Sequence, residues 1–245
     1  MVKDNNINYQ QLLKTYRSVS HDPDLSNNKV DIWRAFLDLP TGQILELSQI
    51  LSEDELVRAE RFHFKKHKIR FIACRGFLRK ILSCYSDTQP DVLQFSYSSL
   101  GKPSLVSSTT QDSVCFNVSH SKNTALFAIA HNCDLGIDIE YIRSISDLDQ
   151  LVKRFFSSGE YKIIHSLSGN KKKEVFFNMW TMKEAYLKAT GEGLSGLEHV
   201  EVCFDSEIKT SLMRAGCPLS GCSVHQFKPA PGYTGAMVVK KHCDS

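Results

Sequence analysis

The sequence predicts a mixed α+β protein built from two similar halves that meet near residues 130–135. In each half, short runs with strand-like composition accompany one long stretch of helical periodicity. The chain has 245 residues, a length that allows one large domain or two small ones. We therefore expect three segments: a loosely held polar leader at 1–29, an N-terminal half at 30–132 and a C-terminal half at 133–245.

The N-terminal half begins with a strand and continues into helices. Residues 30–39 ("VDIWRAFLDL") are rich in β-branched and aromatic side chains, which favours a strand. Ser52 with Glu55 three positions later is a capping-box pattern, and it predicts the start of a helix. Apolar residues recur at helical spacing between 66 and 85, so we expect the long helix of this half there.

Strands and polar turns are expected next. Residues 93–105 ("LQFSYSSLGKPSL") indicate a strand followed by a Gly-Lys-Pro turn. Residues 114–130 indicate two apolar strands. We expect these two strands to be joined by a turn made of Ser119, His120 and Ser121.

The C-terminal half starts with the apolar stretch 133–142 ("CDLGIDIEYI"), which is typical of a buried strand. Two helical patterns follow at 158–167 and 174–194, and the second is expected to end at Gly191 and Gly193. The tail predicts short strands at 199–204, 223–228 and 233–240.

The composition is that of an ordinary globular protein, with 42% hydrophobic and 23% charged residues. A net charge of +3 is too small for a dedicated nucleic-acid binder. Neither a signal peptide nor an apolar run of the roughly 20 residues that cross a bilayer is visible, so we expect a cytoplasmic protein without membrane contact. The eight cysteines lack a CxxC pair and are expected to be apolar fillers; Cys217, Cys222 and His225 suggest a zinc fragment only weakly.

Asp138 and Glu140 lie two positions apart in the apolar stretch, so in a strand they share one face. Neighbouring like charges repel, and unpaired charges are costly to desolvate. One interpretation is a strand face that is simply exposed to solvent. The other is a divalent cation that both carboxylates bind and that also accepts phosphate oxygens.

Glu184 and Lys188 are four residues apart and therefore share one face of the second long helix. An ordinary surface ion pair is one interpretation of this spacing. The alternative is a third metal-binding carboxylate beside an ammonium that neutralises charge on a reacting phosphate.

Two polar turns complete the candidate site. Ser119 and His120 expose a hydroxyl and an imidazole, which fits a polar hairpin or, less well, a hydrolase, because the sequence has no GxSxG elbow. The turn at 101–103 combines a glycine that lets the backbone approach a ligand, a cationic lysine and a stiffening proline.

Five stretches in this order and spacing resemble one family, the 4′-phosphopantetheinyl transferases of the larger, surfactin-synthetase-activating (Sfp) type. The resemblance covers roughly residues 30–240. It implies a pseudo-symmetric monomer of two α+β halves with coenzyme A bound between them, and Mg²⁺ or Mn²⁺ held by Asp138, Glu140 and Glu184. The stretches are "GKP" (101–103), "FNVSHS" (116–121), "GIDIE" (136–140), "KRFFSSGEY" (153–161) and "WTMKEAYLK" (180–188).

The resemblance also implies a reaction, the transfer of 4′-phosphopantetheine from coenzyme A to a serine of an apo acyl or peptidyl carrier protein. Adenosine 3′,5′-bisphosphate is released, and fatty-acid, polyketide or nonribosomal-peptide synthesis is served. Glu184 is the expected base; Lys188 and His120 would contact the pyrophosphate, and Lys188 would protonate the leaving group. The nucleotide and its 3′-phosphate would be held by Lys102, Ser119, Arg58, Arg61 and Arg70, the last beside Phe71, where related enzymes often have threonine.

Two other classes of function use the same residues. A metal-dependent nucleotide phosphohydrolase would use the three carboxylates without a protein acceptor, and a binding module would use none of their chemistry. Turnover of coenzyme A with and without a carrier protein distinguishes the transferase from the hydrolase. The complete set of acids favours an enzyme over the module.

Overall fold

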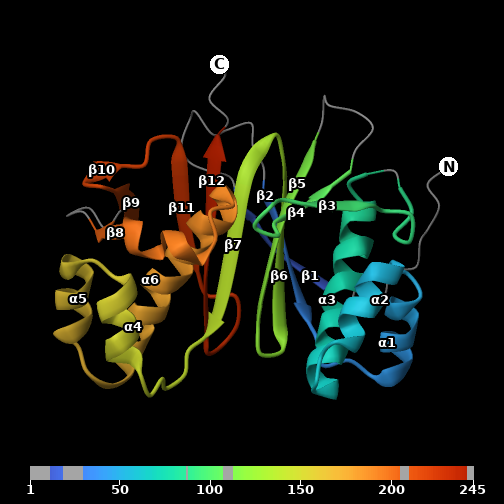
Figure 1. Cartoon of the computed structure of the whole chain (residues 1–245), viewed down its shortest axis with the longest axis horizontal. Coiled ribbons are helices and arrows are strands. Elements are labelled where there is room, and N and C mark those ends of the chain that lie inside the picture. The colour runs from blue at the N-terminus through green and yellow to red at the C-terminus, as the bar shows by residue number, and fades with distance from the viewer. Residues whose placement is uncertain (1–11, 19–29, 87, 107–112, 205–209, 242–245) are drawn as a thin grey trace.

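The computed structural model describes residues 12–18, 30–86, 88–106, 113–204 and 210–241. Its helices and strands form four layers: helices α1–α3, a sheet in the order β1-β2-β6-β5, a second sheet in the order β11-β12-β7, and helices α4–α6 (Figure 1). The prediction of a mixed α+β fold is confirmed. No helix in these ranges has the length and apolar character needed to cross a membrane.

The N-terminal half contains the strand and the long helix that the sequence predicts, and the helix after Ser52 begins with the predicted capping box. Three elements were not predicted: helix α1, strand β4, which begins at the proline of the expected turn, and strand β1, which lies in the polar leader and pairs with β2. The elements are β1 (Leu12–Ser18), β2 (Val30–Phe36), α1 (Thr41–Ser48), α2 (Glu53–Glu60), α3 (Lys65–Ser83), β3 (Phe95–Tyr97), β4 (Pro103–Leu105), β5 (Val114–Ser121) and β6 (Thr124–His131).

The C-terminal half has the predicted strand and both predicted helices, and α6 ends at Gly191 in the left-handed conformation (φ 75°). Helix α4 and strands β9 and β10 were not predicted. The elements are β7 (Cys133–Tyr141), α4 (Leu148–Phe155), α5 (Ser158–His165), α6 (Gly169–Thr190), a 3₁₀ helix (Leu194–His199), β8 (Val200–Phe204), β9 (Thr210–Arg214), β10 (Cys217–Pro218), β11 (Cys222–Phe227) and β12 (Tyr233–Lys241).

The predicted Ser-His-Ser turn is wrong. Ser119, His120 and Ser121 are the last residues of β5, in register with β6, and the chain reverses at Lys122 and Asn123. Lys122 adopts a positive φ of 51°. Because these three residues are in a strand, their side chains alternate between its faces, which a turn would not have required.

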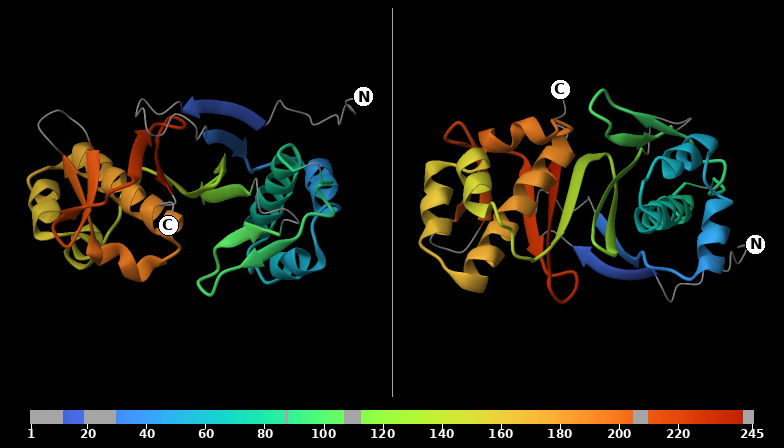
Figure 2. Two further views of the ribbon diagram at one scale, coloured as in Figure 1. Left: turned by 90° about the horizontal axis from the view of Figure 1, so that it is seen from above. Right: turned by 60° about the horizontal axis from the view of Figure 1, so that its bottom comes forward.

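Three apolar clusters hold the layers together. The first lies between α1–α3 and the β2-β6-β5 sheet, and the second lies between α4–α6 and the strands β8, β9 and β12. The third lies between the two sheets, where β2 and β6 pack against β7 and β12. The two views of Figure 2 show the helices on the outer faces and the strands between them. The join between the halves is therefore a sheet-to-sheet contact.

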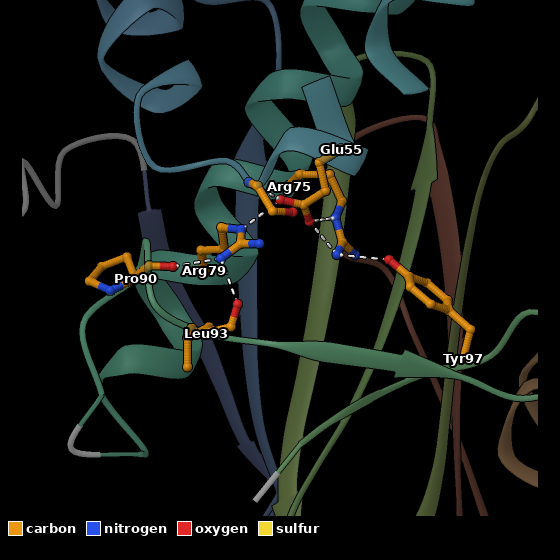
Figure 3. A network of polar contacts seen from close by, with 7 residues as sticks. Glu55, Arg75, Arg79, Pro90, Leu93 and Tyr97 are labelled. Carbon is orange, nitrogen blue, oxygen red and sulfur yellow. Dashed lines mark hydrogen bonds and ion pairs between the residues drawn. The ribbon is translucent and has the colours of Figure 1, made fainter. Parts of the chain in front are cut away.

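The capping box of α2 is also the centre of a buried charge network (Figure 3). Glu55, which caps Ser52, is 2% exposed and accepts hydrogen bonds from Arg75 and Arg79 of α3. Arg79 also donates to the carbonyl oxygens of Pro90 (2.8 Å) and Leu93 (3.0 Å). The network thus fixes the loop that leads into the β3–β4 hairpin.

The C-terminal half repeats this arrangement. Ser157 and Glu160 form the capping box of α5, and Glu160 pairs with the fully buried Lys183 of α6 at 2.8 Å. Lys183 also donates to the carbonyl oxygen of Phe155 at 2.8 Å. In both halves, the glutamate of a capping box is buried and forms an ion pair with a basic side chain of the long helix. This shared local design supports the expected similarity of the two halves.

Candidate active site

A close contact between β7 and α6 brings the acidic stretches together. A Cβ atom on Gly136 of β7 would lie 1.9 Å from the carbonyl oxygen of Ala185 and 2.4 Å from the backbone nitrogen of Ala189. Only glycine permits this approach of strand to helix backbone. Glu184 and Lys188, each adjacent to one of these alanines, are therefore held close to the acids of β7.

Asp138 is buried, with 5% of its surface exposed, and one of its oxygens carries its contacts. Oδ1 accepts hydrogen bonds from the hydroxyl of Ser119 at 2.7 Å and the ammonium of Lys188 at 2.6 Å. Lys188 therefore forms its ion pair with Asp138. The interpretation of Glu184 and Lys188 as an ordinary surface ion pair does not fit this contact. Oδ2 is a buried oxygen with no hydrogen-bond partner among the residues the structure describes.

Glu140 is half-buried and is held in a similar way. Its Oε2 atom accepts a hydrogen bond from the hydroxyl of Ser121 at 2.7 Å and one from Arg143 at 3.2 Å. Asp138 and Glu140 therefore face the end of β5 and each has cationic and hydroxyl partners. The interpretation of a solvent-exposed strand face is wrong for Asp138, because that side chain is buried.

Glu184 lies close enough to the other acids to be affected by their charge. Burial, followed by the charges of Asp138 and Glu140, raises the pKa of its carboxyl to about 7, although the charge of Lys188 opposes this shift. Such a carboxyl is half-ionised near neutral pH, which suits a general base. It also indicates that the site has too little positive charge for three ionised acids.

The raised pKa makes the stability of the metal-free protein depend on pH. Folded Glu184 holds its proton up to a pH of about 7, whereas in the unfolded chain the pKa is 4.5. The stabilisation that this proton gives to the folded state is complete below pH 4.5, the pKa in the unfolded chain. It is lost as the pH rises through about 7, the pKa of Glu184 in the folded protein. In a chelator, we expect wild type to lose more unfolding free energy than Glu184→Gln over this interval, measured by urea denaturation. Parallel pH curves would contradict the clustering of the acids.

The residues present fit a divalent cation. The unpartnered Asp138 Oδ2 and the raised pKa of Glu184 both indicate that positive charge would be favourable there. Within the described ranges, no group of three His, Cys, Asp or Glu side chains already has a metal-binding arrangement. In this structure the ammonium of Lys188 forms an ion pair with the Asp138 carboxylate that would bind the cation. The zinc fragment of Cys217, Cys222 and His225 likewise forms no such group.

A pocket of about 250 Å³ lies beside these acids. Lys102, from the Gly-Lys-Pro turn, lines it and donates to the carbonyl oxygen of Ala189 at the end of α6 (2.6 Å). Its lining residues come from the β3–β4 hairpin, β5 and α6, and include Gly101, Lys102, Asn117, Glu184, Lys188 and Gly191. The pocket therefore lies where the two halves meet, as expected for the active site.

His120 is on the opposite face of β5 from Ser119 and is open to solvent at its surface. Surrounding protein atoms still desolvate it in part, and together with the charges of Lys188 and Arg70 they lower the pKa of its imidazole. His120 is therefore neutral at pH 7 and can donate or accept a hydrogen bond there.

The three expected phosphate-binding arginines do not line that pocket. Arg58 and Arg61 line a separate surface pocket on α2, where Arg58 lies over the ring of Phe71 at 5.6 Å. Arg70 forms a two-bonded ion pair with Asp38 at 2.7 and 2.8 Å. Sequence reasoning placed these three residues by resemblance alone, and their role stays a prediction.

Sequence reasoning missed four contributors to the site. Gly136 was quoted only as part of a motif, and Asn117, Ser121 and Arg143 were given no role. A signal for two of them was present, because Asn117, Ser119 and Ser121 alternate as strand residues on one face do. Reading 119–121 as a turn concealed this alternation.

Known proteins match both halves of the chain. The 4′-phosphopantetheinyl transferase superfamily matches residues 134–236, and the family of N-terminal regions of 4′-phosphopantetheinyl transferases matches residues 40–132. The transferase HetI of Nostoc sp. is 47% identical over 73% of this chain and 75% of its own. A putative transferase of Synechocystis sp. is 38% identical (67% and 66%), and the transferase Sfp of Bacillus subtilis is 26% identical (84% and 90%).

The α+β fold and these matches define the protein as an enzyme, specifically a transferase. The chain belongs to the 4′-phosphopantetheinyl transferase family. Its similarity to Sfp extends over most of both proteins, in agreement with the larger type that the motifs suggested.

Proposed function

We propose that this enzyme transfers the 4′-phosphopantetheine moiety of coenzyme A to a serine of apo carrier proteins and releases adenosine 3′,5′-bisphosphate. The observation that carries the proposal is the 47% identity to a 4′-phosphopantetheinyl transferase over three quarters of that protein. The matched relatives are named transferases, which favours transfer over the alternative of a nucleotide phosphohydrolase. Because all proposed site residues come from one chain, a monomer is sufficient.

Asp138, Glu140 and Glu184 would hold Mg²⁺ or Mn²⁺, which fits the unpartnered Asp138 Oδ2 atom. When bound, the cation would supply positive charge that stabilises the charged pyrophosphate. Oxygen ligands of this kind suit Mg²⁺, which keeps other positions for water and substrate phosphates.

Glu184 is the proposed base. The serine hydroxyl of the carrier loses its proton to the Glu184 carboxylate as its oxygen attacks the β-phosphorus, and the bond from this phosphorus to the oxygen of the departing nucleotide breaks. In the metal-free protein the pKa of Glu184 is about 7, which is in the range that suits a general base at neutral pH.

Lys188 is the proposed partner of the leaving group. Its ammonium is 2.6 Å from Asp138 Oδ1, at the edge of the pocket, and can donate a proton or a charge-assisted hydrogen bond to the departing phosphate oxygen. His120, neutral at pH 7, would contact the pyrophosphate by hydrogen bonding.

The nucleotide would be held by Lys102, Ser119 and the three arginines. Lys102 and Arg70 already bind Ala189 and Asp38, so each would exchange or share that partner when the nucleotide enters. Arg58 and Arg61 are exposed and can receive the 3′-phosphate without first breaking an ion pair that the structure records.

The function is tested by mass spectrometry of several apo carrier proteins incubated with the enzyme, coenzyme A and Mg²⁺. We expect a carrier to gain one phosphopantetheine, and the gain to disappear in a chelator. Cleavage of coenzyme A without any carrier, and without modification when carriers are present, would instead support the phosphohydrolase.

Lys188→Ala is expected to lower kcat more than it raises the KM for coenzyme A. An interaction that strengthens as charge develops on the leaving group acts mainly on the transition state. Removing such a group typically costs about 100-fold or more in kcat. Steady-state kinetics with one carrier measures both constants. An unchanged kcat with a raised KM would make Lys188 a ground-state anchor.

A further inference from the structure

A row of polar side chains joins the two sheets. In strand order, β5 ends one sheet and β7 ends the other, so neither is paired to the other by a backbone ladder. Three residues at alternate positions of β5, which we name the polar seam, accept hydrogen bonds from backbone N–H groups of β7. Asn117 Oδ1 accepts from Ile137 (2.9 Å), Ser119 Oγ from Ile139 (3.4 Å) and Ser121 Oγ from Tyr141 (3.1 Å).

Two members of the polar seam also donate a hydrogen bond to a carboxylate of β7. Ser119 donates its proton to Asp138, and Ser121 donates its proton to Glu140, each at 2.7 Å. A hydroxyl has one proton and two lone pairs. When it accepts from the strand and donates to a carboxylate, both its own direction and that of the carboxylate are fixed. Asn117 makes the strand contact without an acid.

In the described part of the chain, the recorded hydrogen bonds of each acid go to a single carboxylate oxygen. Ser121 and Arg143 bind the same Oε2 atom of Glu140, just as Ser119 and Lys188 bind the same Oδ1 atom of Asp138. Ser121 is itself buried, so its hydroxyl has little access to competing water. The serine therefore fixes the orientation of the carboxylate without neutralising its charge.

We propose that Ser121 is a positioning residue that orients Glu140 for a divalent cation. The β5–β7 join then sets the arrangement of the acids, since the hydroxyls that connect the sheets also orient the carboxylates. This inference rests on the proposed function, because the cation is the one that the transferase would use. The hydroxyl of Ser121 contacts Glu140 and the backbone of Tyr141, and Ser121 does not line the pocket beside the acids, so we assign its effect to Glu140.

The test is the affinity of Ser121→Ala for Mn²⁺, measured by electron paramagnetic resonance with saturating coenzyme A and no carrier. Loss of a group that orients a metal ligand typically weakens metal binding by about 10- to 100-fold. We expect a rise in the Mn²⁺ Kd of that size. Ser121→Thr keeps the hydroxyl, and we expect it to restore most of the affinity.

Tyr85→Phe is the matched control for the loss of a hydroxyl that accepts from an N–H group and donates to a carboxylate. The Tyr85 hydroxyl accepts from the indole N–H of Trp33 at 2.9 Å and donates to Asp31 at 2.7 Å, away from the pocket, so thermal unfolding of this variant and of Ser121→Ala should show comparable losses of stability. Only Ser121→Ala should lose much Mn²⁺ affinity. Wild-type affinity in Ser121→Ala, or an equal loss in Tyr85→Phe, would overturn the proposal.

Failure of the proposed function would look different. In that case the wild-type enzyme would bind Mn²⁺ but modify none of the carrier proteins offered with coenzyme A. Failure of the inference alone leaves the wild-type transferase active and the Mn²⁺ affinity of Ser121→Ala unchanged.

Discussion

Asp138→Ala is expected to reduce phosphopantetheine transfer by about 100- to 1000-fold, the usual cost of removing one group that stabilises transition-state charge. The substitution removes a proposed metal ligand and also releases Lys188 from its 2.6 Å contact, so two parts of the charge arrangement change together. The measurement is the initial rate of carrier modification at saturating Mg²⁺ and coenzyme A.

The fold of Asp138→Ala should be preserved. Removal of a buried carboxylate relieves its desolvation cost but also removes the partner of Lys188, and these contributions oppose each other. We therefore expect little change in Tm. Asp149→Ala is the control, since the carboxylate of Asp149 pairs with Lys172 at 2.8 Å on the surface and does not line the pocket beside the acids. Near-normal transfer by Asp138→Ala at high Mg²⁺ would contradict its role as a ligand.

Gly136→Ala is expected to lower the free energy of unfolding by about 3 kcal/mol or more, at the upper end for overpacking a core. Its methyl group would overlap the backbone of α6 at Ala185 and Ala189, and helix backbone cannot move aside as a side chain can. For a chain of this size, the loss corresponds to a Tm lower by roughly 6–12 °C. Differential scanning calorimetry measures it.

The same substitution should also lower kcat in the fraction that folds. If α6 moves away from β7, Glu184 and Lys188 move with it, and the contact of Lys188 with Asp138 lengthens. Gly42→Ala is the matched control, because a Cβ at Gly42 would meet no atom within 4 Å. Stability of Gly136→Ala equal to that of Gly42→Ala would show that the strand and helix are less closely packed than the structure indicates.

Local patterns were good guides to the elements with strong periodicity. The capping box at Ser52 predicted α2, and helical patterns predicted α3, α5 and α6, because these signals depend on neighbours within one or two turns. They failed at the end of β5, where Ser119, His120 and Ser121 are polar but extended. The burial of Ser119 and Ser121 against β7 outweighs the local preference of serine for turns, and this burial depends on residues 19 and 20 positions away.

The candidate site, too, could be predicted from the sequence only in part. The pairs Asp138 with Glu140 and Glu184 with Lys188 could be identified from the sequence, since the periods of strand and helix place each pair on one face. Which residue Lys188 would contact could not be identified, because its partner Asp138 is 50 positions away. The arginines show the same limit: resemblance suggested Arg70 as a phosphate ligand, while the structure pairs it with Asp38.

The sequence alone thus determined the family, the main helices and which candidate residues share one face of a strand or helix, all of which depend on short motifs and regular spacing. Tertiary structure alone decided how the acids are held: the polar seam of Asn117, Ser119 and Ser121 connects two sheets, and Gly136 lets α6 lie directly on β7. The physical reason is that hydrogen-bond partners and close packing are set by distances between segments far apart in the chain. No local pattern of residues encodes those distances.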